Sequence, residues 1–500
     1  MHLTEQLKQQ ENLVATLSQQ IADLTSTIES LQQALLAKNK DLGKKGAQIK
    51  GLSKILSNKS EKQTDATTQE VEAKKTPTPK ERGNNGAKRK VHYNLETIYT
   101  DCYPPIQGFN PDLYKSFNYQ DVIRYEYKPA RFIKHIYRVH CYRINDSLIK
   151  GEAPAAPIFN SNYDGSFIAG IAQLRYIYSM SVERIVKFFN ESGFKLEKPT
   201  AHGLLKKAAD ILENLYKASL VAVLESPYIS GDESYHTVLL DKGSRKGYIW
   251  GLHSQTNRLI HFFFENGSRS AEVLHKRLDG YKGTIQSDGY SPYRALETEQ
   301  FPDIKRIACF QHVKRKFIDA NEDPKAQHIV NLINKLYQAE HKNKIGINNW
   351  TIEDNYAYRQ QYYPPIMTEI KEELLSIKNS SDYIKSSDLG KAVEYMLNEW
   401  NALINIFSDG AYNLDNNLIE QCNRYISLSR RNSLFFGSNK GAERGALFYT
   451  LAVSCRNNKI NFLEYLTDIL NKTALLPPNT KLEVYRDMLP DKWKKEAKVE

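Results

Sequence analysis

A seven-residue repeat of apolar positions runs through residues 1–57. Its first seam holds an apolar residue in every repeat, at Leu7, Val14, Ile21, Ile28, Leu35, Leu42, Ile49 and Leu56. The second seam holds Leu3, Gln10, Leu17, Leu24, Leu31 and Leu52, and Lys38 and Lys45 interrupt it. So narrow a stripe is typical of a coiled coil rather than of a helix packed on its own domain. We therefore expect a parallel coiled coil that makes the protein a homodimer or a higher oligomer.

The apolar repeat ends before residue 58. Residues 58–90 are rich in Ser, Thr, Lys and Glu and almost free of large apolar side chains, which predicts a flexible linker with a basic end. Residues 91–160 contain short segments, such as 132–139, in which apolar and polar positions alternate. This alternation predicts a small β module.

Residues 161–224 change to a helical period. Ser181 is the expected N-cap of one helix, Gly193 ends it, and Thr200 begins the next. The second helix carries polar, mostly basic side chains near its start, at Lys198, His202 and Lys206. Two helices joined by a short turn resemble a DNA-binding helix-turn-helix, and an ordinary helical hairpin explains the pattern equally well.

From residue 225 the pattern predicts strands and helices in alternation. The expected strands are 228–240, 248–253, 258–264, 284–288 and 304–310, with helices beginning at Ser270 and Ser291. The resulting order, β-β-β-α-β-α-β, resembles that of a ribonuclease-H-like α/β sheet. In such a sheet the first and fourth strands are neighbours.

This order gives a meaning to two aspartates. Asp232 lies inside the first expected strand, where a buried carboxylate is costly unless it is paired or bound to a metal ion. Asp288 ends the fourth strand, so both carboxylates would meet at one place. Two such groups repel each other unless a hard divalent cation neutralises them. The alternative for Asp288, which precedes Gly289, is a simple turn residue.

A third carboxylate is expected on a helix after the fifth strand. Asp415 or Asn416 can cap such a helix, and Glu420 then projects from its first turns. Arg424 follows four residues later on the same face. In the alternative interpretation Glu420 and Arg424 form a surface ion pair worth less than about 1 kcal/mol.

Composition and charge narrow the class of protein. The 500 residues include 41% hydrophobic and 25% charged residues, which excludes global disorder and a single small module. The net charge of +11 favours a polyanionic partner, nucleic acid before an anionic membrane surface. No run approaches the roughly 18 apolar residues that cross a bilayer, and the first residues lack a signal-peptide core. We expect a soluble cytoplasmic protein that binds no membrane.

Five segments together resemble one known family. They are Gly231-Asp232-Glu233-Ser234, Gln286-Ser287-Asp288-Gly289-Tyr290, Cys309-Phe310-Gln311-His312-Val313-Lys314-Arg315-Lys316-Phe317, Asp415-Asn416-Asn417-Leu418-Ile419-Glu420 and Arg430-Arg431-Asn432-Ser433-Leu434-Phe435-Phe436-Gly437-Ser438. In order and spacing they are similar to the transposases of the insertion-sequence-66 family over roughly residues 90–475. Each segment alone is a weak signal, whereas the combination is specific.

The resemblance implies an acidic-triad (DDE) transposase, in which Asp232, Asp288 and Glu420 bind two Mg²⁺ or Mn²⁺ ions. These ions would support DNA cleavage and strand transfer by in-line displacement at phosphorus. The catalytic domain would span 225–475, with a helical insertion at about 321–407 and a C-terminal tail at 476–500. The implied partners are double-stranded DNA, as element ends and target, and small accessory proteins of the same element. The implied location is the bacterial nucleoid.

The chain departs from the family upstream, and it offers further candidate DNA contacts downstream. Many members carry a four-cysteine zinc module upstream, but here only Cys102 and Cys141 lie in 91–160, so we expect a degenerate module without structural zinc. Basic residues follow Cys309 and surround Glu420 in the sequence, and they are candidate DNA contacts, at His312, Lys314, Arg315, Arg424, Arg430, Arg431 and Lys440. For His312 a structural role is the more common outcome.

Three other functions compete with transposition. A different ribonuclease-H-like nuclease or resolvase would hydrolyse DNA without joining strands. A catalytically inactive DNA-binding protein descended from a transposase would not need the three acidic residues. A coiled-coil scaffold explains only the first sixty residues.

Overall fold

The computed structural model describes residues 161–495 continuously, together with Asn110, residues 132–137, 141–144, 147–150, 154 and 156–159. The predicted coiled coil, the linker and most of the β module lie outside the described residues. Within 91–160, β1 (Cys141–Ile144) and β2 (Ser147–Lys150) pair as an antiparallel hairpin. These strands and all the elements below belong to one compact unit, Val122–Glu500.

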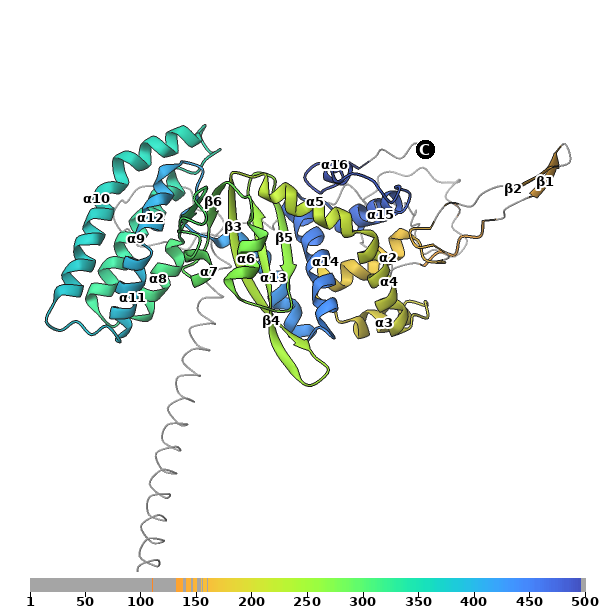
Figure 1. Cartoon of the computed structure of the whole chain (residues 1–500), viewed down its shortest axis with the longest axis horizontal. Helices are drawn as coiled ribbons and strands as arrows, with labels where there is room; N and C mark the ends of the chain where they lie inside the picture. The colour runs from red at the N-terminus through yellow and green to blue at the C-terminus, as the bar shows by residue number, and fades with distance from the viewer. Residues whose placement is uncertain are drawn as a thin grey trace, which may run out of the picture. The chain divides into compact units, whose positions relative to one another are not determined.

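A five-stranded mixed sheet lies at the centre of this unit (Figure 1). Its strands are β3 (Tyr228–Leu239), β4 (Ser244–Ser254), β5 (Leu259–Phe264), β6 (Gly283–Gln286) and β7 (Ile304–Ile307), in the spatial order β5-β4-β3-β6-β7. β3, β4 and β5 are antiparallel to one another, whereas β6 and β7 run parallel to β3. The predicted strands are confirmed, and so is the adjacency of the first and fourth strands.

The fourth and fifth strands end earlier than the sequence predicts. The backbone N–H of Ser287 donates to the Ile307 carbonyl at 3.1 Å, and there the β6–β7 pairing stops. The N–H of Tyr290 then donates to the Asp288 carboxylate at 3.0 Å, which forms a turn. Asp288 therefore lies in the loop after β6 rather than in the strand, because its own side chain stabilises the turn.

Helices pack on the β5 side of the sheet and on the face that carries α13 (Figure 1). They are α2 (Gly165–Tyr176), α3 (Val182–Glu191), α4 (Lys198–Ile211), α5 (Glu213–Leu224), α13 (Asn417–Asn432), α14 (Asn439–Asn457), α15 (Phe462–Thr473) and α16 (Leu482–Asp487). Two short helices connect the last strands: α6 (Ala271–Arg277) lies between β5 and β6, and α7 (Ser291–Arg294) lies between β6 and β7 in the chain. α16 lies in the segment that the sequence analysis assigned to a C-terminal tail.

α14 covers the open edge of β5. The hydroxyls of Thr450 and Ser454 accept the backbone N–H groups of Phe262 and Ile260 at 2.9 and 3.0 Å. An unpaired strand edge exposes such groups to other chains. The polar side chains within this otherwise buried helix therefore satisfy the sheet edge instead of a partner strand.

The two predicted helices before the sheet are confirmed as α3 and α4. Ser181 caps α3 by accepting the N–H of Arg184, and Gly193 follows with φ +88°, a conformation that favours glycine. α4 begins at Lys198, two residues before the expected Thr200, because Pro199 fits the first helical turn. The role of this pair in DNA binding stays a prediction.

The predicted helical insertion forms a second layer of its own beside β7 (Figure 1). It follows α8 (Phe310–Asp319) and consists of α9 (Pro324–Lys342), α10 (Ile352–Asn379), α11 (Asp388–Asn398), α12 (Trp400–Asn405) and the 3₁₀ turn Ile406–Ser408. Its buried core is separate from the main core and includes Ile329, Leu336, Ile370 and Val393. In the part of the chain that the structure describes, no helix is both long and apolar enough to cross a membrane.

Candidate active site

The pairing of β3 with β6 brings the two aspartates to the same level of the sheet. Ser230 of β3 pairs in parallel with Gln286 of β6, and Asp232 and Asp288 each follow that pair by two residues. The two carboxylates are close enough for Asp288 to raise the pKa of Asp232. The adjacency that the order of elements predicted therefore places two acidic side chains together.

Asp232 lies within β3 and is half-buried. Burial is the main cause that raises the pKa of Asp232 to about 8, and the neighbouring Glu233 adds to the effect. Its side-chain partner is neutral: Nδ2 of Asn423, on α13, donates to Oδ2 of Asp232 at 2.7 Å. Among the described residues, a charged Asp232 carboxylate therefore has no cation among its hydrogen-bond partners.

Glu233 is the next residue along β3 and points to the opposite face, as successive residues of a strand do. Its carboxylate accepts hydrogen bonds from Arg269 at 2.5 and 3.0 Å. The Arg269 guanidinium also lies over the rings of Tyr290 and Tyr248. Glu233 is thus paired with a cation of its own, in contrast to Asp232.

The N-terminus of α13 is attached directly to the end of the sheet. Nδ2 of Asn416 donates to the Gly231 carbonyl at 2.9 Å, and the N–H of Asn416 points to Sγ of Cys309 at 3.3 Å. Cys309 is buried, and burial raises the pKa of its thiol to about 12. These contacts fix α13 beside Asp232, so that Asn423 reaches the aspartate and Glu420, one turn earlier, lies nearby.

Glu420 faces α8 rather than the aspartates. Its carboxylate oxygens lie 3.7 Å from Nε2 of His312 and 3.9 Å from Nη2 of Arg315. The alternative ion pair with Arg424 does not occur among the described residues. Oε1 of Glu420, the oxygen nearest to His312, is buried and accepts no hydrogen bond from any described residue.

The three carboxylates are suitable ligands for a hard divalent cation, but in this structure they lie too far apart to bind one together. Asp232, Asp288 and Glu420 offer oxygen donors, which Mg²⁺ prefers, and no described residue gives Asp232 a cationic partner. Within the described residues, however, no three His, Cys, Asp or Glu side chains lie close enough together to hold a metal ion. Glu420 would have to turn away from His312 and Arg315 to join the two aspartates.

The candidate DNA contacts fall into two groups. The first group lies on α8 and α13. Lys314 lies over the Tyr337 ring, and Arg430 donates to the Tyr235 carbonyl and stacks on the Tyr235 ring. Arg424 and Arg431 are exposed. No carboxylate lies within ion-pair distance of Arg424, Arg430 or Arg431 in the described part of the chain. This group begins beside Glu420 and extends along α13.

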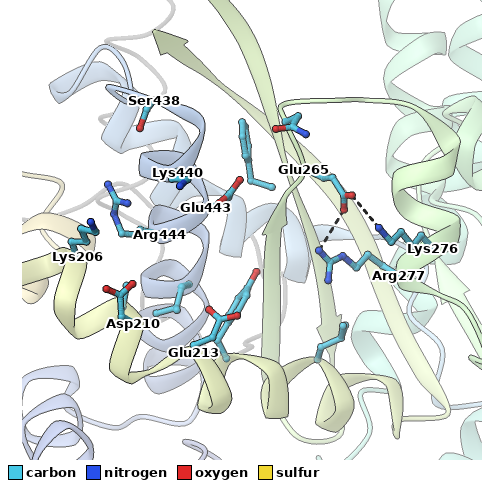
Figure 2. Close-up of a pocket in the computed structure, with 16 residues that line it drawn as sticks. Lys206, Asp210, Glu213, Glu265, Lys276, Arg277, Ser438, Lys440, Glu443 and Arg444 are labelled. Atoms are coloured by element: carbon cyan, nitrogen blue, oxygen red, sulfur yellow. Dashed lines mark hydrogen bonds and ion pairs between the residues drawn. The ribbon is translucent and has the colours of Figure 1, made fainter. Parts of the chain in front are cut away.

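Two residues of the second group, Lys206 and Lys440, line a groove of about 900 Å³ between α4, α5, β5, α6 and α14. Figure 2 shows Lys206 of α4 and Lys440 of α14 on its wall together with Arg444. Lys198 and His202 precede Lys206 at helical spacing, and partial burial and Lys198 lower the pKa of His202. Acidic side chains alternate with these cations, at Asp210, Glu213, Glu265 and Glu443, and Glu265 is paired with Lys276 and Arg277. The groove is therefore mixed in charge.

Sequence reasoning missed the side chains that hold the aspartates in place. Asn423 was detectable, because it lies three residues after Glu420 on the same helical face. Tyr395 and Glu399 gave no signal, although the N–H of Gly289 donates to the Tyr395 hydroxyl at 3.0 Å. Of the two adjacent aromatics in the last motif, Phe436 is buried and Phe435 is exposed.

Comparisons with known proteins identify the family of the chain. The family model described as Transposase IS66 family matches residues 160–444, more than half of the chain, and its range includes all three acidic residues. Uncharacterized protein y4jD of Sinorhizobium fredii (strain NBRC 101917 / NGR234) is 26% identical over 374 residues, which cover 71% of each chain. Two further uncharacterized proteins of that organism are similar. y4qI is 24% identical over 72% of this chain and 68% of its own, and y4hP is 30% identical over 47% and 44%.

Proposed function

The chain belongs to the IS66 family of transposases, as its motifs predicted, and on this basis we propose that it cuts and joins DNA strands with Asp232, Asp288 and Glu420. The observation that carries the proposal is the parallel pairing of β3 with β6, which aligns Asp232 and Asp288. The strand order β5-β4-β3-β6-β7 supports a ribonuclease-H-like catalytic domain.

The protein side chains would act by orientation and charge. Asn423 holds the Asp232 carboxylate through a hydrogen bond from a neutral donor, so that no protein cation competes with a metal ion for it among the described residues. Tyr290 orients Asp288 through one carboxylate oxygen, and Asn416 fixes the helix that carries Glu420. Mg²⁺ or Mn²⁺, bound by these three carboxylates, would activate the attacking oxygen and stabilise the leaving oxygen.

The surface along α13 supports DNA as the partner. The sequence contains no acidic residue between Glu420 and Glu443, whereas it contains four basic ones, Arg424, Arg430, Arg431 and Lys440. The exposed apolar side chains Leu434 and Phe435 lie between Arg431 and Lys440 in the sequence. In this proposal the basic side chains contact the phosphate backbone of DNA, so that the affinity for DNA depends on the salt concentration. Element ends and target DNA, dimerisation through residues 1–57 and accessory proteins remain parts of the proposal.

The test is metal-dependent cleavage by the Asp288→Asn variant of the full chain on labelled duplexes that carry the element's ends. We expect this substitution to abolish cleavage and strand transfer and to leave DNA binding unchanged. Asp279→Asn is the matched control, because Asp279 is also followed by glycine and is exposed. Cleavage that persists in Asp288→Asn contradicts the assignment. Cleavage without joining by the unaltered protein favours the alternative, a nuclease or resolvase.

A further inference from the structure

The helical insertion contacts the core through a buried cluster of charges. Glu399, between α11 and α12, accepts from Arg306 of β7 at 2.7 Å, and both side chains are only 1% exposed. The other oxygen of Glu399 accepts from Arg294 at 2.6 Å, and Arg306 also pairs with Glu297 at 3.1 Å. Two arginines and two glutamates thus compensate each other in charge.

This cluster lies directly beneath the Asp288 loop. Nη1 of Arg306 lies 3.5 Å from the Asp288 carbonyl, and the next N–H along the chain, that of Gly289, donates to the hydroxyl of Tyr395 in α11. A Cβ at Gly289 would lie 2.8 Å from that hydroxyl and 2.9 Å from Oε1 of Glu399. The loop therefore lies so close to the insertion that a larger residue at position 289 would displace the side chains of Tyr395 and Glu399.

Stability alone does not account for such a cluster. Burying charged groups removes their favourable hydration free energy. Apolar residues of similar volume therefore often replace a buried ion pair without loss of stability. What apolar residues cannot supply is a pair of polar contacts to the peptide group that joins Asp288 to Gly289. The carboxylate of Asp288 is thereby oriented from its backbone, while its Oδ1 accepts from Tyr290.

We propose that Tyr395 and Glu399 are positioning residues for Asp288, and that one role of the insertion is to fix this loop. The inference rests on the proposed function, since it assumes that Asp288 is catalytic. Tyr395 acts through the Gly289 N–H, and Glu399 acts through Arg306. The insertion is then part of the catalytic apparatus without contributing a group that touches DNA at the reacting phosphate.

The experiment uses the Tyr395→Phe variant of the full chain, which removes one hydroxyl and keeps the ring. Tyr383→Phe is the matched control, because the Tyr383 hydroxyl also bonds within the insertion, to Glu394 at 3.0 Å, but does not contact the loop. Three quantities are measured: the Mn²⁺ affinity of the free protein by electron paramagnetic resonance, the Mg²⁺ dependence of cleavage, and DNA binding in EDTA.

We expect Tyr395→Phe to weaken Mn²⁺ binding by about tenfold and to raise the Mg²⁺ concentration for half-maximal cleavage, with DNA binding unchanged. Tyr383→Phe should match the unaltered protein in all three. Glu399→Gln should behave like Tyr395→Phe if it folds, and if it unfolds Tyr395→Phe decides alone. Unchanged Mn²⁺ binding and Mg²⁺ dependence in Tyr395→Phe overturn the inference. The proposed function fails separately, when Asp288→Asn still cleaves.

Discussion

Asn423 donates a hydrogen bond of 2.7 Å to Oδ2 of Asp232, across the contact between α13 and β3. The Asp232 carboxylate is half-buried, and no arginine or lysine in the described part of the chain donates a hydrogen bond to it. A neutral donor orients a carboxylate without cancelling its charge, which is what a metal ligand needs. The pair links the helix that carries Glu420 to the strand that carries Asp232.

We predict that Asn423→Ala lowers metal-dependent cleavage by about 10- to 100-fold, because Asp232 loses its orienting donor. DNA binding in EDTA should stay unchanged, since Asn423 is buried and is not one of the exposed cations. Gln421→Ala, an exposed change on the same helix, is the control and should cleave at the normal rate. The interpretation is wrong if Asn423→Ala retains full cleavage while folded.

Local patterns explain why the sequence predicted the two aspartates. Alternation along 228–240 and the Asp-Gly turn after β6 are properties of short segments, and the order of elements then places the strands side by side. The same patterns could not predict the burial of Glu399. It follows an amphipathic helix and resembles a surface residue until Arg294 and Arg306 meet it from distant parts of the chain.

The direction in which Glu420 points was equally beyond the sequence. Helical spacing made Arg424 its expected neighbour, but His312 and Arg315 of α8 lie closer. That contact depends on how α8 packs against α13, which no local pattern encodes. Asn416, which attaches α13 to β3, was foreseen only as a cap, and its side chain instead bonds the Gly231 carbonyl.

The cations of α13 lead to a prediction about salt. Arg424 and Arg431 are exposed and have no acidic partner within the described residues, so each is free to contact a phosphate. The double variant Arg424→Gln/Arg431→Gln should make the negative slope of the log association constant against log salt concentration shallower by roughly 2. Fluorescence anisotropy of a labelled duplex at several salt concentrations measures this slope.

The control for that experiment is Lys282→Gln, because Lys282 is an exposed cation that already pairs with Asp303 at 3.0 Å. It should leave the slope unchanged. A double variant whose slope equals that of the unaltered protein would place the DNA elsewhere, with the groove around Lys206 and Lys440 as the next candidate.

Arg359 supports a prediction about stability. It is buried in α10 and donates to Glu340 at 2.8 Å and to the carbonyls of Asp409 and Tyr412 at 2.6 Å each. A lysine keeps the charge but lacks the planar fork that reaches all three acceptors. Arg359→Lys should therefore lower the free energy of unfolding by about 2–4 kcal/mol.

Urea denaturation followed by circular dichroism measures that change. Arg431→Lys, at an exposed position, is the control and should stay within about 0.5 kcal/mol. Equal unfolding midpoints for Arg359→Lys and the unaltered protein would mean that water or other groups satisfy these carbonyls. The segment 409–412 leads into α13, so a loosened Arg359 should also reduce cleavage.

The last prediction concerns acid. His261 is buried in β5 beside Ser219, and burial lowers its pKa from 6.5 to about 3, with Arg277 acting in the same direction. Below pH 6.5 the unfolded chain therefore takes up a proton that the folded protein does not bind. This contribution to stability is complete above pH 6.5 and falls by about 1.4 kcal/mol per pH unit as the pH drops toward 3. His261→Gln removes the titrating group, so its stability deficit relative to the unaltered protein should shrink between pH 7 and pH 5. Urea unfolding at both pH values measures the deficit, with His328→Gln, at an exposed position, as control. A deficit of equal size at both pH values would show that His261 takes up its proton in the folded protein as readily as in the unfolded chain.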